Sequence, residues 1–441
     1  MKLTFYGGVK EVTGANYLLE SGDTKILIDC GLKQGSNYVE RQNWEPFPYK
    51  PTEIEAVFVT HTHIDHIGRL PLLSKRGFRG KIYSTPPTKE AAALLLLDSI
   101  HVLEQEARKH NKPPLCTEGD ARVVMEAWQT IDYYQPLTIG NLKVSLYNSG
   151  HILGSASILF DDGKTKIVFS GDLGNSPAPL LGDKDNLPEC DYAVMESAYG
   201  GRTHEDLEQR QEILEDLIEE TAKAGGVLMI PAFAMERTQE MLYEIDKLAD
   251  EGRIPRVPIF LDSPLAIRLT DVYNQYKNYL KADGEIHFKF KDLKMTMTTE
   301  ESKAIARTPP PKVIIAGSGM SNAGRILFHE KNYLSDSHNT LLIIGYQATG
   351  SLGRQLLDGA KEVKILGEKV PVRARIKAIG GYSAHADQPQ LLDWLKPQRQ
   401  LLKKIFVVQG EDDQSAALVR KVRDDLAIEA IIPDIGVKYE L

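Results

Sequence analysis

Short apolar runs that end in a polar residue, with helical patterns between them, constrain the fold of this chain more than any other feature. Runs rich in β-branched residues occur at 25–29, 56–60, 142–147, 166–170, 192–195, 227–230, 257–261, 313–316, 340–344, 376–379 and 405–408. Amphipathic stretches with a helical period lie at 205–224, 237–250 and 388–395. Strands that alternate with helices predict an α/β fold with much parallel strand pairing.

Polar side chains that can do chemistry stand at, or just beyond, the ends of six strand-like runs. They are Asp29, His61, His151, Asp172, Glu196 and His385. In α/β folds the loops at the carboxyl ends of strands gather around one crevice where ligands bind. We therefore expect these side chains to meet in a single site.

Composition limits the classes of protein that this chain can be. With 441 residues it is long enough for two or three domains, and its formal net charge is −8. General electrostatic binding of nucleic acid favours a basic chain, so any RNA binding here must use a local groove and bound metal. Three cysteines without CxxC spacing indicate a reducing, cytoplasmic setting. The longest apolar run, 91–97, is too short to span a bilayer, so no membrane anchoring is expected. A homodimer is left open.

The cluster His61-Thr62-His63-Ile64-Asp65-His66 directly follows the predicted strand 56–60. Imidazole nitrogens and carboxylate oxygens are the ligands that zinc prefers in catalytic sites. In an extended loop His61 and His63 point the same way, and a helix that starts near Asp65 turns Asp65 and His66 toward a second position. This spacing predicts two metals in one cleft, against the plain alternative of a His-rich surface loop.

One loop cannot complete two coordination shells, so further ligands must come from distant segments. His151 lies between two strand-like runs. Asp172 follows a strand and is flanked by two glycines. Asp172 is the natural carboxylate to bridge two cations. Asp29 can accept a hydrogen bond from a ligating histidine and fix its tautomer. The alternative for all three is an ordinary turn residue at a strand end.

Taken in order, Asp29, the HxHxDH motif, His151 and Asp172 resemble the motifs of the metallo-β-lactamase fold. Segments 194–200, 317–320 and 381–387 resemble its β-CASP branch, which contains RNase J, mRNA 3′-end cleavage factors and DNA-repair nucleases. The chain looks most like the short bacterial ribonucleases of this branch. The resemblance implies a metallo-β-lactamase αββα sandwich formed by residues 1–199 and 359–441, with an α/β β-CASP domain at 200–358 inserted.

The resemblance also implies roles for the residues, in a ribonuclease that cuts single-stranded RNA. One zinc would be held by His61, His63, His151 and Asp172, and a second by Asp65, His66 and Asp172. Two such cations lower the pKa of a bridging water toward neutrality. Glu196 would orient His385, and His385 would give a proton to the leaving oxygen. Asp65, Glu196 and His385 are the predicted catalytic residues.

The chain departs from the family pattern at Gln409, where the third β-CASP motif has a histidine that ligates the second zinc. A glutamine offers a neutral carbonyl oxygen, which suits Mg²⁺ or Mn²⁺ better than Zn²⁺. We therefore expect the second metal to be weakly held, or to be Mn²⁺ or Mg²⁺. Three other functions stay open: a catalytically weakened RNA-binding scaffold, a small-molecule ester or lactone hydrolase, and a DNA-directed nuclease.

Glycine-rich turns suggest where a substrate phosphate binds. Gly317-Ser318-Gly319 follows a strand and precedes a helical pattern at 324–330. Exposed backbone N–H groups at such turns bind anions. Ser318 and Gly319, and similarly Ser383 and Ala384, are the predicted phosphate contacts, with ordinary turn chemistry as the alternative. The sequence does not separate endonuclease from 5′-exonuclease action.

Overall fold

The chain forms two compact units in the computed structural model, which describes residues 1–35, 37–109, 113–204, 207–281, 288–345, 347 and 350–441. Unit 1 contains Met1–Thr203 and His385–Leu441, and unit 2 contains His204–Ala384. The predicted end of the insert, at residue 358, falls inside unit 2. The reason is that strand β19 (Arg375–Ala378) pairs with β16 (Thr340–Ile343), so the chain stays in unit 2 beyond that point.

Within the described residues, unit 1 contains two seven-stranded sheets, ordered β22-β1-β2-β3-β4-β5-β6 and β21-β20-β11-β10-β9-β8-β7. The first sheet is built from β1 (Lys2–Gly7), β2 (Asn16–Ser21), β3 (Thr24–Ile28), β4 (Ala56–Phe58), β5 (Lys81–Ser84), β6 (Trp128–Thr130) and β22 (Lys438–Glu440). The second is built from β7 (Leu137–Ile139), β8 (Leu142–Asn148), β9 (Ala156–Asp161), β10 (Lys166–Phe169), β11 (Tyr192–Glu196), β20 (Lys404–Val408) and β21 (Ala430–Ile431).

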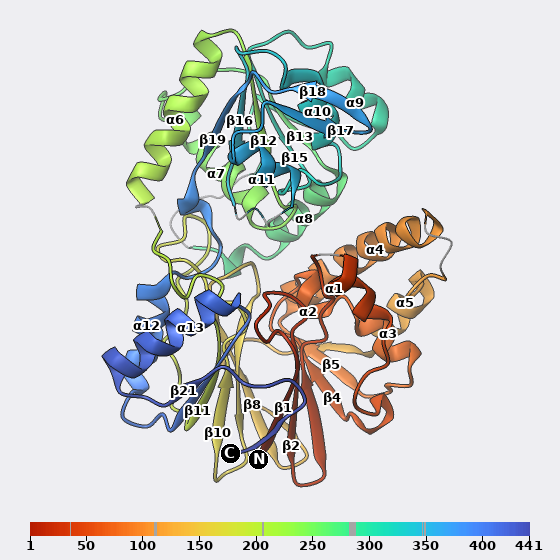
Figure 1. Cartoon of the computed structure of the whole chain (residues 1–441), viewed down its shortest axis with the longest axis vertical. Coiled ribbons are helices and arrows are strands. Elements are labelled where there is room, and N and C mark those ends of the chain that lie inside the picture. Colours follow the sequence, from red (N-terminus) through yellow and green to blue (C-terminus); the bar gives the residue numbers. More distant parts are fainter. Residues whose placement is uncertain (36, 110–112, 205–206, 282–287, 346, 348–349) are drawn as a thin grey trace. The chain divides into compact units, whose positions relative to one another are not determined.

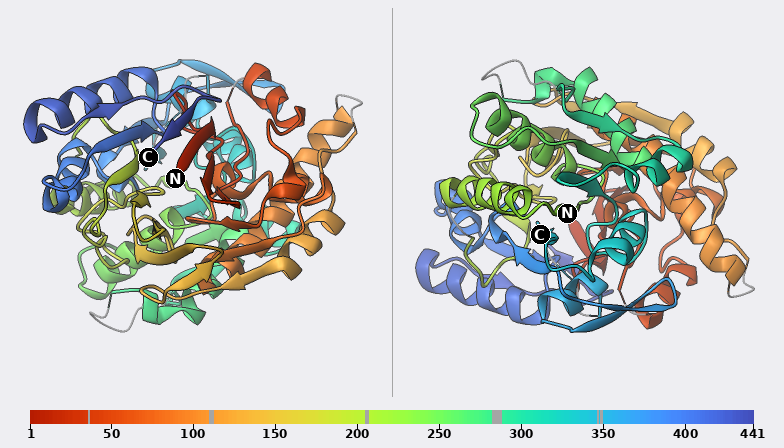
Figure 2. Two further views of the ribbon diagram at one scale, coloured as in Figure 1. Left: turned by 90° about the horizontal axis from the view of Figure 1, so that it is seen from below. Right: turned by 90° about the horizontal axis from the view of Figure 1, so that it is seen from above.

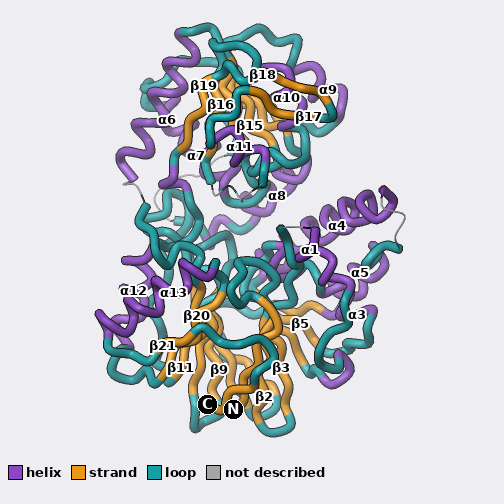
Figure 3. Tube along the Cα trace, viewed as in Figure 1, coloured by secondary structure: helices purple, strands orange, loops and turns teal. Residues whose placement is uncertain are grey.

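The strands of unit 1 are apolar on both faces because each sheet is covered twice. Ile26 and Ile28 of β3 lie in the core between the two sheets, where Phe160 of the second sheet also packs. Leu27, between them, points the opposite way into the core beneath the helices. Successive strand side chains alternate between faces, so this pattern requires a helical layer outside the sheets. Figure 3 shows the paired sheets in orange with helices on both sides of unit 1.

The helices of unit 1 supply these outer layers. They are α1 (Asn37–Arg41), α2 (Ile64–Ile67), α3 (Leu70–Lys75), α4 (Pro86–Lys109), α5 (Glu118–Ala127), α12 (Gln388–Leu395) and α13 (Asp412–Lys421). Leu391 of α12 and Leu418 of α13 pack on the second sheet, and Leu73 of α3 and Leu96 of α4 pack on the first. Unit 1 is thus an α/β/β/α arrangement, and the predicted α/β fold is confirmed.

Unit 2 contains one main sheet, ordered β14-β13-β15-β12-β16-β19 among the described residues, and a separate hairpin β17-β18. All neighbours in the main sheet are parallel. The further strands of the main sheet are β12 (Val227–Pro231), β13 (Ile259–Asp262), β14 (Leu293–Met295) and β15 (Lys312–Ala316), and the hairpin consists of β17 (Glu362–Ile365) and β18 (Glu368–Pro371). The helices are α6 (Leu207–Lys223), α7 (Arg237–Asp250), α8 (Pro264–Gln275), α9 (Thr299–Ile305), α10 (Ile326–Tyr333) and α11 (Leu352–Leu357).

The strand order of unit 2 creates a switch point between β12 and β15. From β12 the chain crosses to β13 on one side, and from β15 it crosses to β16 on the other. In open parallel sheets, ligands bind beyond the carboxyl ends of strands at such points. Phe233 follows β12 here and lies against Gly319, which follows β15: a Cβ atom on Gly319 would be 2.7 Å from the Phe233 ring.

The first and last strands of the chain are neighbours in one sheet. Lys2 of β1 is opposite Glu440 of β22, so the two termini lie side by side (Figures 1 and 2). Unit 1 is therefore complete only when residues from both ends of the chain are present. Among the helices placed by the structure, none combines the length and apolar character needed to cross a membrane.

Candidate metal centre

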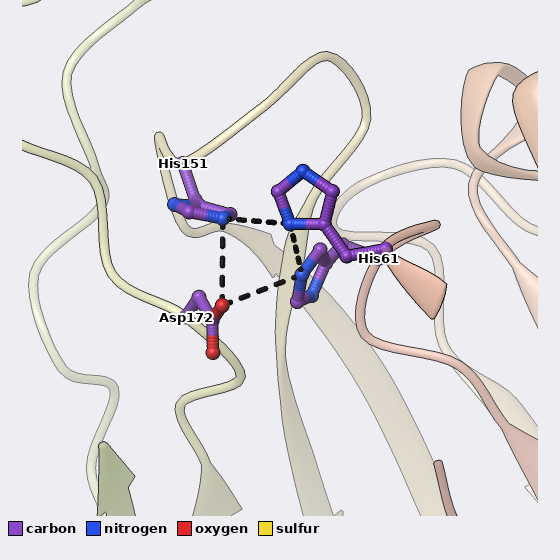
Figure 4. A group of neighbouring side chains, drawn as sticks. His61, His151 and Asp172 are labelled. Carbon is purple, nitrogen blue, oxygen red and sulfur yellow. Dashed lines mark hydrogen bonds and ion pairs between the residues drawn. The ribbon is translucent and has the colours of Figure 1, made fainter. Parts of the chain in front are cut away.

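Four side chains converge on one point in unit 1. His63 Nδ1 lies 3.1 Å from His61 Nε2 and 3.2 Å from His151 Nε2. Asp172 Oδ2 lies 3.4 Å from both of those Nε2 atoms, and Figure 4 shows His61, His151 and Asp172 facing one another. Ligands placed tetrahedrally around zinc at its usual distances lie about 3.3 Å apart. The four donor atoms therefore have the spacing and the chemistry of a divalent-metal site.

Strand ends deliver these four donors. His61 follows β4, His63 immediately precedes α2, His151 lies in the loop between β8 and β9, and Asp172 follows β10. Gly171 precedes Asp172 with a φ of +58°, and a Cβ atom there would lie 2.8 Å from the Thr60 side chain. Only glycine fits this close turn, which brings Asp172 next to the histidines.

Burial and charge keep the donors in the forms that bind cations. Burial, helped by the neighbouring His66, holds the pKa of His61 well below its ordinary value, so the ring is neutral and keeps a lone pair. Burial acts to raise the pKa of Asp172, but the neighbouring His66 outweighs it and holds that pKa well below its ordinary value. His61 therefore presents a neutral imidazole and Asp172 an ionised carboxylate, which are the ligand forms that metals require.

Asp29 orients His66 from beneath the cluster. Its buried carboxylate is 2.7 Å from His66 Nδ1 through Oδ2. The same carboxylate accepts hydrogen bonds from the Thr60 N–H and hydroxyl, both at 2.8 Å. This arrangement places the Nδ1 proton of His66 toward Asp29 and turns Nε2 toward Asp172 Oδ1, at 3.4 Å, and Asp65 Oδ2, at 3.8 Å. The aspartate thus holds the ring as expected for a carboxylate behind a ligating histidine.

Gln409 occupies the space between His66 and Asp172. Its side-chain Nε2 lies 2.8 Å from His66 Nε2 and donates to Asp172 Oδ1 at 3.0 Å. An amide nitrogen has two protons and no lone pair to offer a cation. The predicted second metal position therefore contains a hydrogen-bond donor between its ligands. The first position thus has the donor spacing of a divalent-metal site, whereas the Gln409 amide lies between two of the ligands predicted for the second.

The buried Glu196 and the partly exposed His385 form a pair beside the four donors. His385 Nδ1 lies 3.1 and 3.2 Å from the two carboxylate oxygens of Glu196 and 3.9 Å from Asp172 Oδ2. Glu196 is fixed by hydrogen bonds from the N–H groups of Leu173, at 2.7 Å, and Ala198, at 3.2 Å. Burial acts to lower the pKa of His385, but Glu196 outweighs it and raises that pKa to about 9. The structure thus brings together His385 and Glu196, which are far apart in sequence, next to the donor cluster.

The predicted phosphate contacts all lie in unit 2. The Ser318 N–H donates to the Ala323 carbonyl at 3.2 Å, and its hydroxyl accepts from the N–H groups of Asn322 and Ala323. These bonds close the turn itself, and they leave the Ser318 hydroxyl proton, rather than its N–H, as the group to offer an anion. The Ser383 N–H likewise donates to the Gly380 carbonyl. Anion binding at Ser318, Gly319, Ser383 and Ala384 stays a prediction.

Sequence reasoning missed two residues that organise the site. Thr60 hydrogen bonds to Asp29, and its hydroxyl lies 3.1 and 3.3 Å from the Nδ1 atoms of His61 and His66. Its position directly before the HxHxDH motif was a usable signal. Lys184 donates three hydrogen bonds behind Asp172, but a lysine between two aspartates in a polar loop carries no comparable signal.

Comparison with known families agrees with this geometry. A model of the metallo-beta-lactamase superfamily matches residues 10–218, and a Beta-Casp domain model matches residues 238–356. A model described as the Zn-dependent metallo-hydrolase RNA specificity domain matches residues 369–433. "Ribonuclease TTHA0252" of Thermus thermophilus is 36% identical over 425 residues, which cover 95% of each chain. The chain belongs to the β-CASP branch of the metallo-β-lactamase superfamily. As a member it is a metal-dependent hydrolase of the nuclease class.

Other β-CASP relatives cover nearly all of this chain. An "RNase J-like protein" of Methanocaldococcus jannaschii is 32% identical and covers 98% of both chains. A "Transcription termination factor FttA" of Methanosarcina mazei is 32% identical over 97% of this chain and 70% of its own length. A crystal structure of a protein of unknown function from Enterococcus faecalis shares the fold, with a TM-score of 0.57 at 13% identity over 100% of this chain and 99% of that one.

Proposed function

We propose that this chain is a zinc-dependent ribonuclease that hydrolyses phosphodiester bonds of single-stranded RNA. The observation that carries the proposal is the four-donor cluster next to the Glu196–His385 pair. A metal site joined to a histidine held by a buried carboxylate suits hydrolysis with a poor leaving group. Relatives named as ribonucleases support RNA as the substrate.

In this proposal the zinc is held by His61, His63, His151 and Asp172. When bound, the cation supplies a Lewis acid that neutralises charge on the phosphate and lowers the pKa of water. Asp65 is proposed to accept a proton from the attacking water, and burial raises the pKa of its carboxyl. His385, with Nδ1 bound to Glu196, delivers a proton to the leaving oxygen through Nε2.

Gln409 sets the proposed metal content. Because its amide lies between His66 and Asp172, we propose one tightly held Zn²⁺ per chain and a second position that is weak or takes Mn²⁺ or Mg²⁺. Metal analysis after dialysis against a mild chelator should give one zinc for the natural chain. Gln409→His, which adds an imidazole ligand, should raise this toward two. Two zincs retained by the natural chain would contradict the proposal.

The switch point of unit 2 supports single-stranded RNA, rather than a duplex, as the proposed substrate. Phe233 is 41% exposed beside Gly319, and an exposed aromatic ring can stack on an unpaired base. The phosphate next to that base is proposed to meet Ser318 and Gly319, and a further phosphate is proposed to meet Ser383 and Ala384.

All three thiols are buried and unpaired, which supports a reducing, cytoplasmic setting.

The test is cleavage of 5′-labelled single-stranded RNA with added Zn²⁺ or Mn²⁺. Duplex RNA, single-stranded DNA and a simple ester serve as comparison substrates. We expect single-stranded RNA to be cut, and His385→Ala to lose most of that activity. His338→Ala, an exposed histidine paired with Asp336, is the matched control. RNA binding without cleavage under any cation would favour a scaffold, and ester turnover without RNA cleavage would favour a small-molecule hydrolase.

A further inference from the structure

Lys184 lies in the loop between β10 and β11 and uses its whole ammonium group inside the protein. Nζ donates to the Gly174 carbonyl at 2.8 Å, to the Ser176 hydroxyl at 3.1 Å and to Gln390 Oε1 at 3.0 Å. An ammonium group has three protons, and here each has an acceptor. Lys184 is therefore occupied structurally and has no donor left for a substrate phosphate.

Gln390 continues the connection into α12. Its Oε1 also accepts the Ser176 N–H at 2.8 Å, while its Nε2 donates to Asn175 Oδ1 at 2.8 Å and to the Ser176 carbonyl at 3.1 Å. These contacts fix the first turn of α12 to residues 174–176. The first turn of α12 follows His385 in the chain, and residues 174–176 follow Asp172.

The two segments also meet directly. Gly174 pairs with His385 as an isolated antiparallel bridge, and the Ala386 N–H donates to the Leu173 carbonyl at 2.7 Å. Beyond this short contact, the hydrogen bonds of Lys184 and Gln390 extend the junction. Trp394 Nε1 of α12 also donates to the Asp185 carbonyl at 3.1 Å, and Leu173 shares a buried apolar cluster with Ala386 and Leu391. Lys184 and Gln390 thus form a clamp that, together with the bridge and this packing, holds the segment of His385 against the segment that follows Asp172.

The loop that carries His151 is attached at the same place. The Gly174 N–H donates to the Ser149 carbonyl at 2.8 Å, and a Cβ atom on Gly174 would lie 1.9 Å from the Gly150 carbonyl oxygen. A Cβ atom on Gly150 would lie 2.8 Å from the backbone nitrogen of Lys184. Both glycines are thus packed flat against the segment that Lys184 holds, which leaves no room for side chains there.

We infer that Lys184, together with Gln390, is a positioning residue that sets His385 against the metal-ligand segment containing Asp172. This inference rests on the proposed function, because it assigns the clamp to the delivery of the leaving-group proton. Replacing Lys184 by methionine keeps the stem but removes the donor of the Gly174 carbonyl, and it leaves Gln390 Oε1 with the Ser176 N–H alone. The segment after His385 should then move relative to Asp172 while the four metal donors stay in place.

The first measurement compares two substrates. Lys184→Met should lower kcat on single-stranded RNA about 10–100-fold with little change in KM, as expected for a residue that supports a reacting one. Hydrolysis of bis(p-nitrophenyl) phosphate should stay within about 3-fold of the natural chain, because its leaving group departs as a phenolate without a proton. His385→Ala should show the same selectivity, and the double variant should be no worse than His385→Ala alone. Lys166→Met, which breaks a surface pair with Glu189, is the control.

The second measurement does not depend on RNA cleavage. Hydrogen exchange followed by mass spectrometry should show faster exchange at 172–177 and 385–395 in Lys184→Met and in Gln390→Met, with the zinc content unchanged. Exchange and rates equal to those of Lys166→Met would overturn the inference. Loss of zinc with an equal fall on both substrates would also overturn it, because the clamp would then support the ligands and not His385. If the natural chain cuts no RNA, the proposed function fails, and the exchange result still decides whether the clamp exists.

Discussion

Two buried aspartates, Asp172 in unit 1 and Asp262 in unit 2, stand near the carboxyl ends of strands and have histidine neighbours. Asp262 is 2.7 Å from His329 Nε2 and accepts hydrogen bonds from Arg325 at 2.7 Å and from the hydroxyls of Thr296 and Ser302 at 2.6 Å. Asp172 instead lies 3.4 Å from ring nitrogens of three histidines, His61, His66 and His151.

The distances separate a structural carboxylate from a ligand. At 2.6–2.7 Å the groups around Asp262 form direct hydrogen bonds with its carboxylate. The cluster is therefore closed, in the sense that its members satisfy one another and leave no space for a cation. Burial acts to raise the pKa of Asp262, but its hydrogen bonds, that from His329 foremost, hold this pKa well below its ordinary value. At 3.4 Å the histidines around Asp172 are beyond good hydrogen-bond length and have the spacing of ligands around a common centre. An Asp–His pair at a strand end therefore does not indicate a metal site until these distances are known.

A third buried carboxylate, Glu330, completes the comparison because no cation or metal-ligand geometry accompanies it. Ser321 donates a hydrogen bond to one oxygen, and the other has no hydrogen-bond partner among the described residues. Burial raises the pKa of Glu330 to about 8. A buried carboxylate without a positive partner thus takes up a proton rather than remain charged.

The largest expected effect is at the four-donor metal site around Asp172, called the open site because its donors do not hydrogen bond closely to one another. His151→Ala removes one of the four donors, so we expect loss of bound zinc and a fall in RNA cleavage well beyond the about 10–100-fold typical of residues that only support a ligand. The free energy of unfolding of the metal-free chain should change little. Metal analysis and cleavage rates measure this, and a variant that retains zinc and activity would break the assignment of the open site.

At the closed cluster around Asp262, a substitution should lower the stability of the chain instead of its metal content. Asp262→Ala leaves Arg325 and His329 without their carboxylate, and breaking a buried pair in this way costs about 3–5 kcal/mol. Urea unfolding followed by circular dichroism measures the loss, with the exposed Asp336→Ala as the control. Zinc content at the first position should be unchanged. A fall in zinc content with normal stability would reverse the comparison.

Asp29 tests an intermediate case, since its hydrogen bonds are as short as those of Asp262 but reach a histidine of the site. Asp29→Asn keeps the shape and removes the charge behind His66. RNA cleavage should fall about 10–100-fold, as for other carboxylates behind ligating histidines. Zinc at the four-donor position should remain, because His66 is not among those donors. Titration with a competing chelator would reveal any loss of zinc affinity, which would contradict this division of roles.

The smallest effect is the pH dependence that Glu330 contributes. Its folded pKa is raised, so the folded chain holds a proton that the unfolded chain releases, and stability falls as pH rises from the ordinary glutamate value to about 8. Between pH 7 and 8 the natural chain should lose about 1 kcal/mol more than Glu330→Gln. Urea unfolding at the two pH values measures the difference. Parallel behaviour of both chains would show that Glu330 is ionised when folded.

Much of the architecture follows from local patterns. Helices α7 and α12 span Arg237–Asp250 and Gln388–Leu395, as their apolar periods predict, and β12 covers the run at 227–230. The pairing direction is less local. A two-residue turn at Gly22 and Asp23 joins β2 to β3, so this part of unit 1 is antiparallel within a fold that was predicted to have much parallel pairing. The end of unit 2 could not be placed from sequence, because it depends on the pairing of β19 with the distant β16.

The site shows the same division between local and distant information. The HxHxDH cluster is visible in sequence because its spacing is set within one loop, and Asp172 follows a strand that is equally visible. The contact of the Gln409 amide with His66 and Asp172 joins residues more than two hundred positions apart, so its effect on the second metal position needed the structure. Lys184 was missed for a similar reason: one of its three acceptors, Gln390, is 206 positions away in the sequence.

The discontinuity of unit 1 orders events during synthesis. All four metal donors precede residue 203, and unit 2 is complete at residue 384, but His385, β20 and β22 are added last. Domains commonly fold as units as the chain emerges, at about 5–20 residues per second. For roughly 3–11 seconds after unit 2 is finished, the nascent chain carries its metal ligands while the strands that complete both sheets of unit 1 are still being added. The loops that carry the metal donors are therefore made well before the strands that complete the two sheets beneath them.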